Sequence, residues 1–119
     1  MKKIEVIRDR DIALEAMGAS HLLDYLNDVT YDELVSILGE PTFNTPSGDG
    51  KVQKEWVVYF TYPYELQGDK VYCFTIYDWK TYDEEYTITK NRKWNIGGHS
   101  KLYGYELIEF IYESLNEVK

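Results

Sequence analysis

Two apolar runs decide the fold of this chain: EWVVYFTY at residues 55–62 and VYCFTIYDW at residues 71–79. β-Branched and aromatic residues of this kind favour strands, and the near-continuous apolar character predicts strands that are covered on both faces. Pro63 ends the first run, and Gly68-Asp69 supply a turn before the second. Because the connection is too short for a parallel crossover, the two strands are expected to pair in antiparallel fashion.

Shorter segments extend this sheet in both directions along the chain. Residues 86–89, YTIT, are predicted to form a third strand after a polar turn at 82–85. WNI at 94–96 is predicted to form a short fourth strand before two glycines. Residues 3–8 form either a short strand or an extended lead-in. The result is an antiparallel meander of about four strands.

The clearest helix signal precedes the meander. Thr30 and Glu33 form a T-x-x-E capping box, and apolar residues recur on one helical face at 31, 34, 35 and 38. Gly39 then provides a C-terminal stop, and Pro41 forbids continuation of the helix. Residues 41–50, PTFNTPSGDG, have the composition of a loop.

Two further helical regions are predicted near the ends of the chain. Residues 11–28 are expected to form one kinked helix or two short helices, with Ser20 capping the second. Ser100 can cap a last helix at 101–117, whose apolar stripe packs on the sheet. The prediction is a single α+β domain over residues 1–119. It has N-terminal helices, the antiparallel meander and a C-terminal helix packed on the sheet, with the helices on one face.

Charge is distributed unevenly along the chain. No lysine or arginine occurs between Arg10 and Lys51, whereas eight acids lie in that interval, which equals the formal net charge of −8 in magnitude. A field of this sign repels nucleic acid and anionic membranes and attracts basic surfaces. Direct binding to nucleic acid or to a membrane is therefore not expected, and a basic protein surface is the expected partner.

A second acidic row is predicted on the last helix, opposite its apolar stripe. It spans about 16 Å, with neighbouring charges roughly 6 Å apart, which is comparable with the spacing of phosphates along one nucleic-acid strand. Helix faces in solvent normally mix signs, because like charges repel. The predicted partner-binding residues are therefore Asp24, Asp28, Asp32, Glu33, Glu106, Glu109, Glu113 and Glu117.

Local folding offers an alternative explanation for part of this set. Asp32 and Glu33 lie in a first helical turn, where an acid stabilises the helix by about 0.3–1 kcal/mol through the macrodipole. An amphipathic helix must also expose some polar residue, and Glu is a good helix former. The absence of cations over forty residues is harder to explain in this way.

Catalytic chemistry is not indicated by the residues available. The chain has two histidines, His21 and His99, and one cysteine, Cys73, none of them within a recognisable catalytic or metal-binding motif. His21 is expected to pack or cap on a helix, and Cys73 to be a buried, inert thiol. The turn from Gly97 to Ser100 admits two readings, an anion site or a steric requirement for glycine. The prediction is a non-catalytic protein without metal or cofactor.

The single cysteine and the N-terminal sequence bear on location. One cysteine allows no intramolecular disulfide, which fits a reducing compartment. The N-terminus becomes charged before an apolar signal core can form, and no apolar run approaches the length of a membrane span. The expected location is the cytoplasm.

Two resemblances add to these predictions. The sequence TYDELVSILGEPT at 30–42, followed by EWVVYF at 55–60, resembles the helix–LGxP–strand pattern of β-lactamase-inhibitor-like and outer-membrane-assembly lipoprotein domains. Together with FTIYDW at 74–79 and WNIGG at 94–98, it is similar to small proteins carried by phages and mobile elements. The second resemblance implies a host-interaction or counter-defence setting, of the anti-CRISPR or anti-restriction type. It supplies no active-site residues.

The leading hypothesis is an acidic binding protein that inhibits a nucleic-acid-handling host protein, such as a CRISPR effector or a restriction enzyme, by occupying its basic surface. The acids would supply charge, and exposed tyrosines would supply contact area. The alternative is a protein-interaction or homodimeric module whose acidity serves only solubility. A third hypothesis places a small-ligand or enzymatic site at the turn from Gly97 to Ser100.

Overall fold

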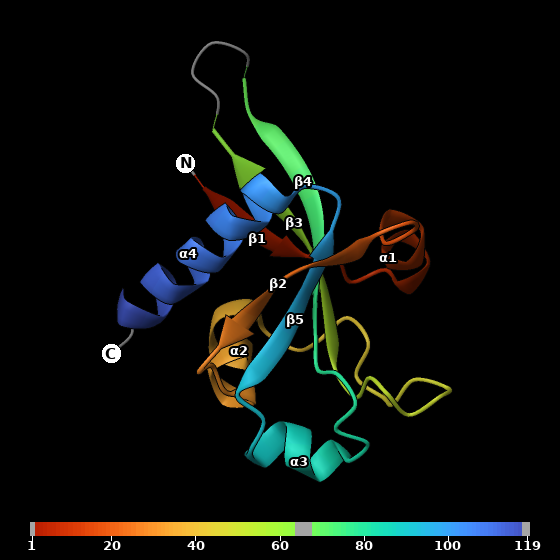
Figure 1. The fold of residues 1–119 in the computed structure, drawn as a ribbon. Helices are drawn as coiled ribbons and strands as arrows, with labels where there is room; N and C mark the ends of the chain where they lie inside the picture. The colour runs from red at the N-terminus through yellow and green to blue at the C-terminus, as the bar shows by residue number, and fades with distance from the viewer. Residues whose placement is uncertain (1, 64–67, 118–119) are drawn as a thin grey trace.

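A five-stranded antiparallel sheet forms the centre of the computed structural model, which describes residues 2–63 and 68–117 (Figure 1). The strands lie in the order β1-β3-β4-β5-β2. The elements in chain order are β1 (Lys3–Val6), α1 (Arg10–Ala16), β2 (His21–Asn27), α2 (Tyr31–Leu38), β3 (Glu55–Tyr62), β4 (Lys70–Tyr77), α3 (Glu84–Thr89), β5 (Lys93–Gly98) and α4 (Lys101–Glu117). The α+β class and the C-terminal helix on the sheet are confirmed.

Three of the four strands predicted for the meander form the middle of this sheet. β3, β4 and β5 are adjacent and antiparallel, so Phe74 of β4 stands between Val58 of β3 and Gly98 of β5. β1 adds to the free side of β3, which resolves the open question about residues 3–8 in favour of a strand. β2 adds to the free side of β5 and forms the other edge.

The two faces of the sheet carry different layers. On one face, Trp56, Val58 and Phe60 of β3 enter the main core beneath α2 and α4. The alternate residue Val57 points to the opposite face and packs in a small cluster with Ile7 and Ala13 of α1. Figure 1 shows α2 and α4 on one side of the sheet and α1 on the other. The expectation of helices on one face only is therefore wrong.

The capping box predicted for α2 is present. The Thr30 hydroxyl accepts a hydrogen bond from the Glu33 backbone N–H (3.1 Å), and the Glu33 carboxylate accepts one from the Thr30 backbone N–H (3.0 Å). Gly39 ends the helix with a φ of 83°, and its carbonyl accepts a hydrogen bond from the indole of Trp56 (2.9 Å). Local signals and core packing agree here, so this helix was predictable.

The helical prediction for residues 20–28 is wrong, because residues 21–27 form strand β2. Leu23 and Leu26 both face the main core, a spacing of three that is typical of a helix. A bulge between Leu22 and Asp24 inserts one extra residue into the strand and so brings both leucines to the same face. If residues 21–27 were helical, the backbone N–H and C=O groups along one edge of β5 would have no strand partner. Pairing with β5 therefore determines the structure of this segment.

The strand prediction for residues 86–89 is also wrong, because residues 84–89 form helix α3. Asp83 caps it by accepting a hydrogen bond from the Glu85 backbone N–H (3.0 Å). Glu84 and Glu85 occupy the first turn, where acids are favourable. These helix-starting signals prevail over the strand preference of the β-branched residues that follow.

A buried carboxylate, that of Asp78, joins three segments next to this helix. One of its oxygens accepts hydrogen bonds from the backbone N–H groups of Gln53 (2.8 Å) and Lys54 (3.0 Å). The other accepts hydrogen bonds from the hydroxyls of Thr81 (3.0 Å) and Thr87 (2.9 Å). Four hydrogen bonds compensate the burial of the charge and hold the start of β3, the end of β4 and α3 together.

Replacing this carboxylate tests its role in folding. Asp78→Ala leaves two buried N–H groups and two hydroxyls without their acceptor, and we expect a loss of about 3 kcal/mol in the free energy of unfolding. The measurement is urea unfolding followed by circular dichroism. Asp69→Ala, at an exposed acid, is the control and should lose less than about 0.5 kcal/mol. Equal losses for the two variants would contradict the anchoring role.

Candidate protein-binding surface

Part of the first predicted acidic region lies beside the second, where β2 and α4 are adjacent (Figure 1). β2 is an edge strand, and α4 packs against it in the main core. The hydroxyl of Tyr112 on α4 accepts a hydrogen bond from the Asn27 backbone N–H (3.0 Å) and donates one to the Asn27 carbonyl (2.9 Å). This pair of bonds fixes the edge strand to the helix.

Acids from both elements converge on Tyr105 of α4. The Glu109 carboxylate accepts a hydrogen bond from the Tyr105 hydroxyl and is the main reason that the pKa of Tyr105 is raised. The charges of Glu106 and of Asp24 on β2 act in the same direction. The bulge in β2 places Asp24 opposite Ile96, on the sheet face that α4 covers. Asp24 therefore belongs to the same surface as the acids of α4.

We refer to Asp24, Tyr105, Glu109, Tyr112 and Glu113 as the acidic-aromatic surface. At about 100° per residue, the four residues on α4 lie within an arc of about 100°, so they share one helical face. The Tyr105 side chain is 55% exposed and that of Tyr112 is 36% exposed. Glu109 and Glu113 are exposed as well.

Some of the predicted acids have a local structural role. Glu33 is occupied by the capping box of α2, and Asp24 accepts a hydrogen bond from the Tyr25 backbone N–H (2.7 Å). Glu106 forms an ion pair with the Lys2 ammonium (3.2 Å), and this hydrogen-bonded carboxylate raises the pKa of Lys2, with a further contribution from Glu113. Asp28 adopts a left-handed backbone with φ of 59°, which Asp tolerates better than most residues.

Asp32 belongs to a different acidic group. With Glu40 and Glu84 it surrounds Tyr31, whose pKa is raised mainly by burial and further by these three charges. The structure therefore brings Asp24 together with Glu106, Glu109 and Glu113, and it places Asp32 and Glu33 on α2 outside the acidic-aromatic surface. Glu117 is exposed in the last turn of α4.

Glu109 and Glu113, on the solvent side of α4, form no ion pair within 4 Å in the described residues, although the charge of Glu113 acts on Lys2 from farther away. Across residues 2–63 and 68–117, the ion pairs within 4 Å are Lys2–Glu106 and Lys54–Glu84. Neither Glu109 nor Glu113 takes part in one of them. Their charges are consequently available to a partner.

The edge of β2 is closed to strand addition where it meets α4. The backbone N–H groups of Tyr25 and Asn27 are already bonded to the Asp24 carboxylate and the Tyr112 hydroxyl. An edge whose donors are occupied does not template another strand. A protein that contacts this region would therefore meet side chains rather than a free backbone edge.

The Gly97–Ser100 segment has a steric explanation. Gly97 and Gly98 lie within β5 and are buried, and a Cβ atom at Gly98 would come within 2.7 Å of the Phe74 ring. Ser100 accepts a hydrogen bond from the Tyr103 backbone N–H (3.4 Å), as expected of a cap. His21 is an exposed residue of β2, rather than a helical one, with its ring 6.1 Å from that of His99.

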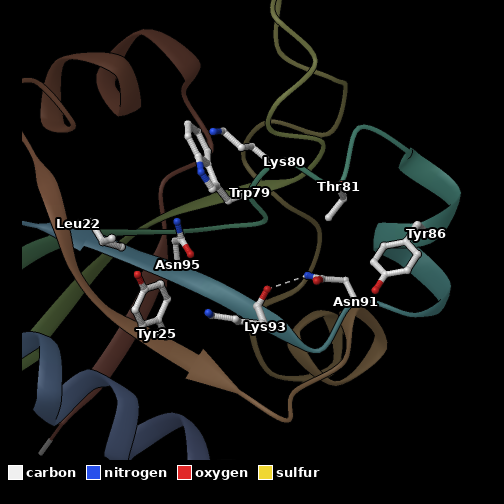
Figure 2. A pocket seen from close by; sticks show the side chains of 9 residues that line it. All are labelled: Leu22, Tyr25, Trp79, Lys80, Thr81, Tyr86, Asn91, Lys93 and Asn95. Atoms are coloured by element: carbon white, nitrogen blue, oxygen red, sulfur yellow. Dashed lines mark hydrogen bonds between the residues drawn. The ribbon is translucent and has the colours of Figure 1, made fainter.

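A second candidate site, missed by the sequence analysis, is a cavity of about 530 Å³ (Figure 2). Its walls come from β2, β5, the segment after β4 and α3. Residues 21–27 were expected to be helical and 86–89 to be a strand, so the segments that enclose it could not be brought together. The one feature of the sequence that could have indicated this cavity is the pair Trp79-Lys80 directly after a strand. The cavity is lined by Leu22, Tyr25, Trp79, Lys80, Thr81, Tyr86, Asn91, Lys93 and Asn95.

Glu55 of β3 lies on the same face of the sheet, in two neighbouring hollows. Burial is the main reason that the pKa of its carboxyl is raised, and the charge of Asp78 adds to the effect. The hydroxyl of Thr75 donates a hydrogen bond to it (2.5 Å), which opposes the shift. Cys73 is half-buried, and burial raises the pKa of its thiol.

Comparisons of the chain with protein-family models, with curated proteins and with solved structures found no match. Within residues 2–63 and 68–117, no helix has the length and apolar character needed to cross a membrane. The same residues contain no group of three or more His, Cys, Asp or Glu that could hold a metal ion.

The contact between Tyr112 and the edge strand can be tested separately from its role in binding. Tyr112→Phe removes the hydroxyl that serves both polar groups of Asn27, and we expect a loss of about 1 kcal/mol in stability. Amide hydrogen exchange at Asn27 should accelerate, as measured by NMR. Tyr105→Phe, which changes an exposed hydroxyl on the same helix, should leave exchange at Asn27 unchanged.

Glu55 should make stability depend on pH. Because its folded pKa lies above the ordinary value of 4.5, the folded state retains a proton that the unfolded state has lost between these two values. Stability contributed by this group therefore falls as the pH rises through that window. Glu55→Gln removes the unfavourable burial of an ionised carboxylate and keeps an oxygen that can accept the hydrogen bond of Thr75.

We expect Glu55→Gln to be more stable than the natural chain at neutral pH, and the difference to disappear below the ordinary pKa of Glu. The measurement is the urea midpoint across the pH range. Glu5→Gln, an exposed acid on β1, controls for the loss of one charge. A gain for Glu55→Gln that persists unchanged at low pH would contradict this account.

Proposed function

We propose that this protein is an acidic, non-catalytic binding protein whose acidic-aromatic surface contacts a basic surface of another protein. One observation carries the proposal: α4 packs on the edge strand β2, where Tyr112 is bonded to Asn27, so that acids distant in sequence lie on adjacent elements beside the exposed Tyr105. Charge and an aromatic contact residue are thus combined on one face. Interfaces are enriched in aromatic residues, and complementary charge supports fast and specific association.

Local folding accounts for Glu106, which pairs with Lys2, but not for Glu109, Glu113 and Glu117 of α4. Glu109 and Glu113 are four residues apart on one face, an arrangement that destabilises an isolated helix by about 0.2–0.5 kcal/mol. Glu117 lies in the last turn, where the helix dipole favours a cation. A binding surface gives a reason for retaining acids at positions where they oppose helix formation.

The two tyrosines supply contact area at a low entropic cost. Tyr112 is held by two hydrogen bonds to Asn27, and Tyr105 has only two side-chain torsions to fix on binding. A side chain that is already fixed loses little rotamer freedom on binding. Tyr105 and Tyr112 are therefore the expected centres of binding energy, with Asp24, Glu109 and Glu113 around them.

The partner that suits such a surface is a protein that handles nucleic acid. Such proteins carry clusters of Lys and Arg for phosphates, and a row of carboxylates can occupy them in place of the phosphates. With the resemblance to proteins of phages and mobile elements, this favours inhibition of a host defence protein, such as a CRISPR effector or a restriction enzyme. The alternative, a homodimeric or interaction module with acidity only for solubility, predicts binding that does not depend on the acids.

A pair of matched double variants tests the proposal. Glu109→Lys/Glu113→Lys reverses two exposed charges four residues apart on α4. Asp11→Lys/Glu15→Lys makes the same change on α1, which covers the opposite sheet face. Partners captured from host lysate are identified by mass spectrometry, and the affinity of each purified partner is then measured by calorimetry.

We expect the α4 variant to weaken binding by about tenfold or more and the α1 variant to change it by less than about threefold. Raising the salt from about 50 to about 500 mM should weaken binding of the natural chain, and added nucleic acid should compete with it. An affinity that does not depend on salt and is unchanged in the Glu109→Lys/Glu113→Lys variant would overturn the proposal and favour the alternative. A concentration-dependent dimer that persists in both variants would support the homodimeric module instead.

A further inference from the structure

The cavity in Figure 2 lies on the face of the sheet that α2 and α4 do not cover. Along β2 and β5, Leu26 and Trp94 enter the main core, whereas their neighbours Tyr25 and Asn95 point the other way. At about 530 Å³ the cavity is within the size range of small-molecule sites. It is separate from the acidic-aromatic surface, so the two sites can be tested independently.

Asn95 gives this cavity a polar centre. Asn95 is only 8% exposed, and its side-chain amide makes no hydrogen bond within the described part of the chain, so its polar atoms meet solvent at the cavity. In Figure 2 this amide projects from β5 into the space between Trp79 and Tyr25. A ligand with a donor and an acceptor would satisfy it.

Aromatic rings border the same space. Trp79, in the segment after β4, is 47% exposed, Tyr25 of β2 is 40% exposed and Tyr86 of α3 is 45% exposed. The other two tryptophans, Trp56 and Trp94, are fully buried in the core. Exposure of three large rings around a hollow is costly in water and is typical of a site that stacks on a planar ligand.

Lysines give the cavity a local charge opposite to that of the whole protein. Lys93 lies with its ammonium 4.2 Å from the centre of the Tyr25 ring, and Lys80 lies 5.7 Å from the centre of the Trp79 ring. Lys51 approaches Trp79 as well, at 5.8 Å. The lining includes two lysines and no acid. An anionic group would therefore be attracted to the rim.

We propose that this cavity binds a nucleotide. The base would stack on Trp79 and Tyr25, the Asn95 amide would pair with the edge of the base, and Lys80 and Lys93 would hold the phosphates. An amide offers one donor and one acceptor side by side, which matches a base edge. Stacking on an aromatic side chain stabilises a bound base, because every base has a π-face. A neutral sugar would leave the two ammonium groups without a role.

The fluorescence of Trp79 provides a direct measurement, because it is the exposed tryptophan. ATP, GTP, CTP and UTP are titrated as the nucleotide probes. Adenosine carries the base without phosphate, pyrophosphate carries the charge without a base, and maltose is a neutral sugar. We expect at least one nucleotide to quench the fluorescence with a dissociation constant below about 1 mM, and the three partial probes to bind at least about tenfold more weakly.

Three variants, measured by calorimetry, assign the contacts. Asn95→Leu keeps a similar volume and removes the amide, so nucleotide binding should fall about tenfold or more while the melting temperature stays the same or rises. Lys80→Asn removes a cation and suits the positive φ of 56° at that position. Trp79→Ala removes a stacking ring. Each should weaken nucleotide binding about tenfold.

The Glu109→Lys/Glu113→Lys variant is the control on the other face, and its nucleotide affinity should stay within about twofold at physiological salt. Loss of binding in Asn95→Leu with a raised melting temperature would separate a ligand contact from a merely structural residue. Absence of quenching and of heat with all four nucleotides at about 1 mM would overturn the proposal. Equal affinity for pyrophosphate alone would also overturn it, since this would show general attraction of anions.

Discussion

The pairing of β2 with the edge of β5 determines where both candidate sites lie. The bulge between Leu22 and Asp24 turns Asp24 towards α4, while Tyr25 faces the cavity. Consecutive residues of one short strand thus serve opposite faces of the sheet. A regular strand in place of the bulge would exchange the faces of all residues on one side of it. Both sites therefore depend on a single register, which Tyr112 fixes through its bonds to Asn27.

Asp78 has a comparable role for the walls of the cavity. Its carboxylate joins residues 53–54, Thr81 and Thr87, while the adjacent Trp79 is exposed at the cavity. A buried, fully bonded charge is costly to move, so it keeps neighbouring segments in one arrangement. Binding surfaces that are held in place before binding lose less entropy. The buried Asp78 thus holds the exposed Trp79 in position at the cavity.

The sequence predicted those elements whose local signals and tertiary packing agree. Thr30, Glu33 and Gly39 define α2 without help from the rest of the chain, and the apolar stripe of α4 suffices for its position. The prediction for residues 21–27 was wrong because two leucines three positions apart suit both a helix and a bulged strand. Only pairing with the free edge of β5 distinguishes the two structures. The charge gap identified Asp24, but the convergence on Tyr105 and the unpartnered amide of Asn95 arise from strand pairing.

The two proposed sites attract ligands of opposite charge, and both can exist in one small protein because they lie on opposite faces of the sheet. At physiological salt, exposed charges are largely screened beyond about 8 Å. A helix layer alone is about 10 Å thick, so the acids on the outer side of α4 and the lysines of the cavity act on different ligands. The formal charge of −8 therefore does not describe either face. A basic protein would meet Glu109 and Glu113, while an anionic ligand would meet Lys80 and Lys93 across the core.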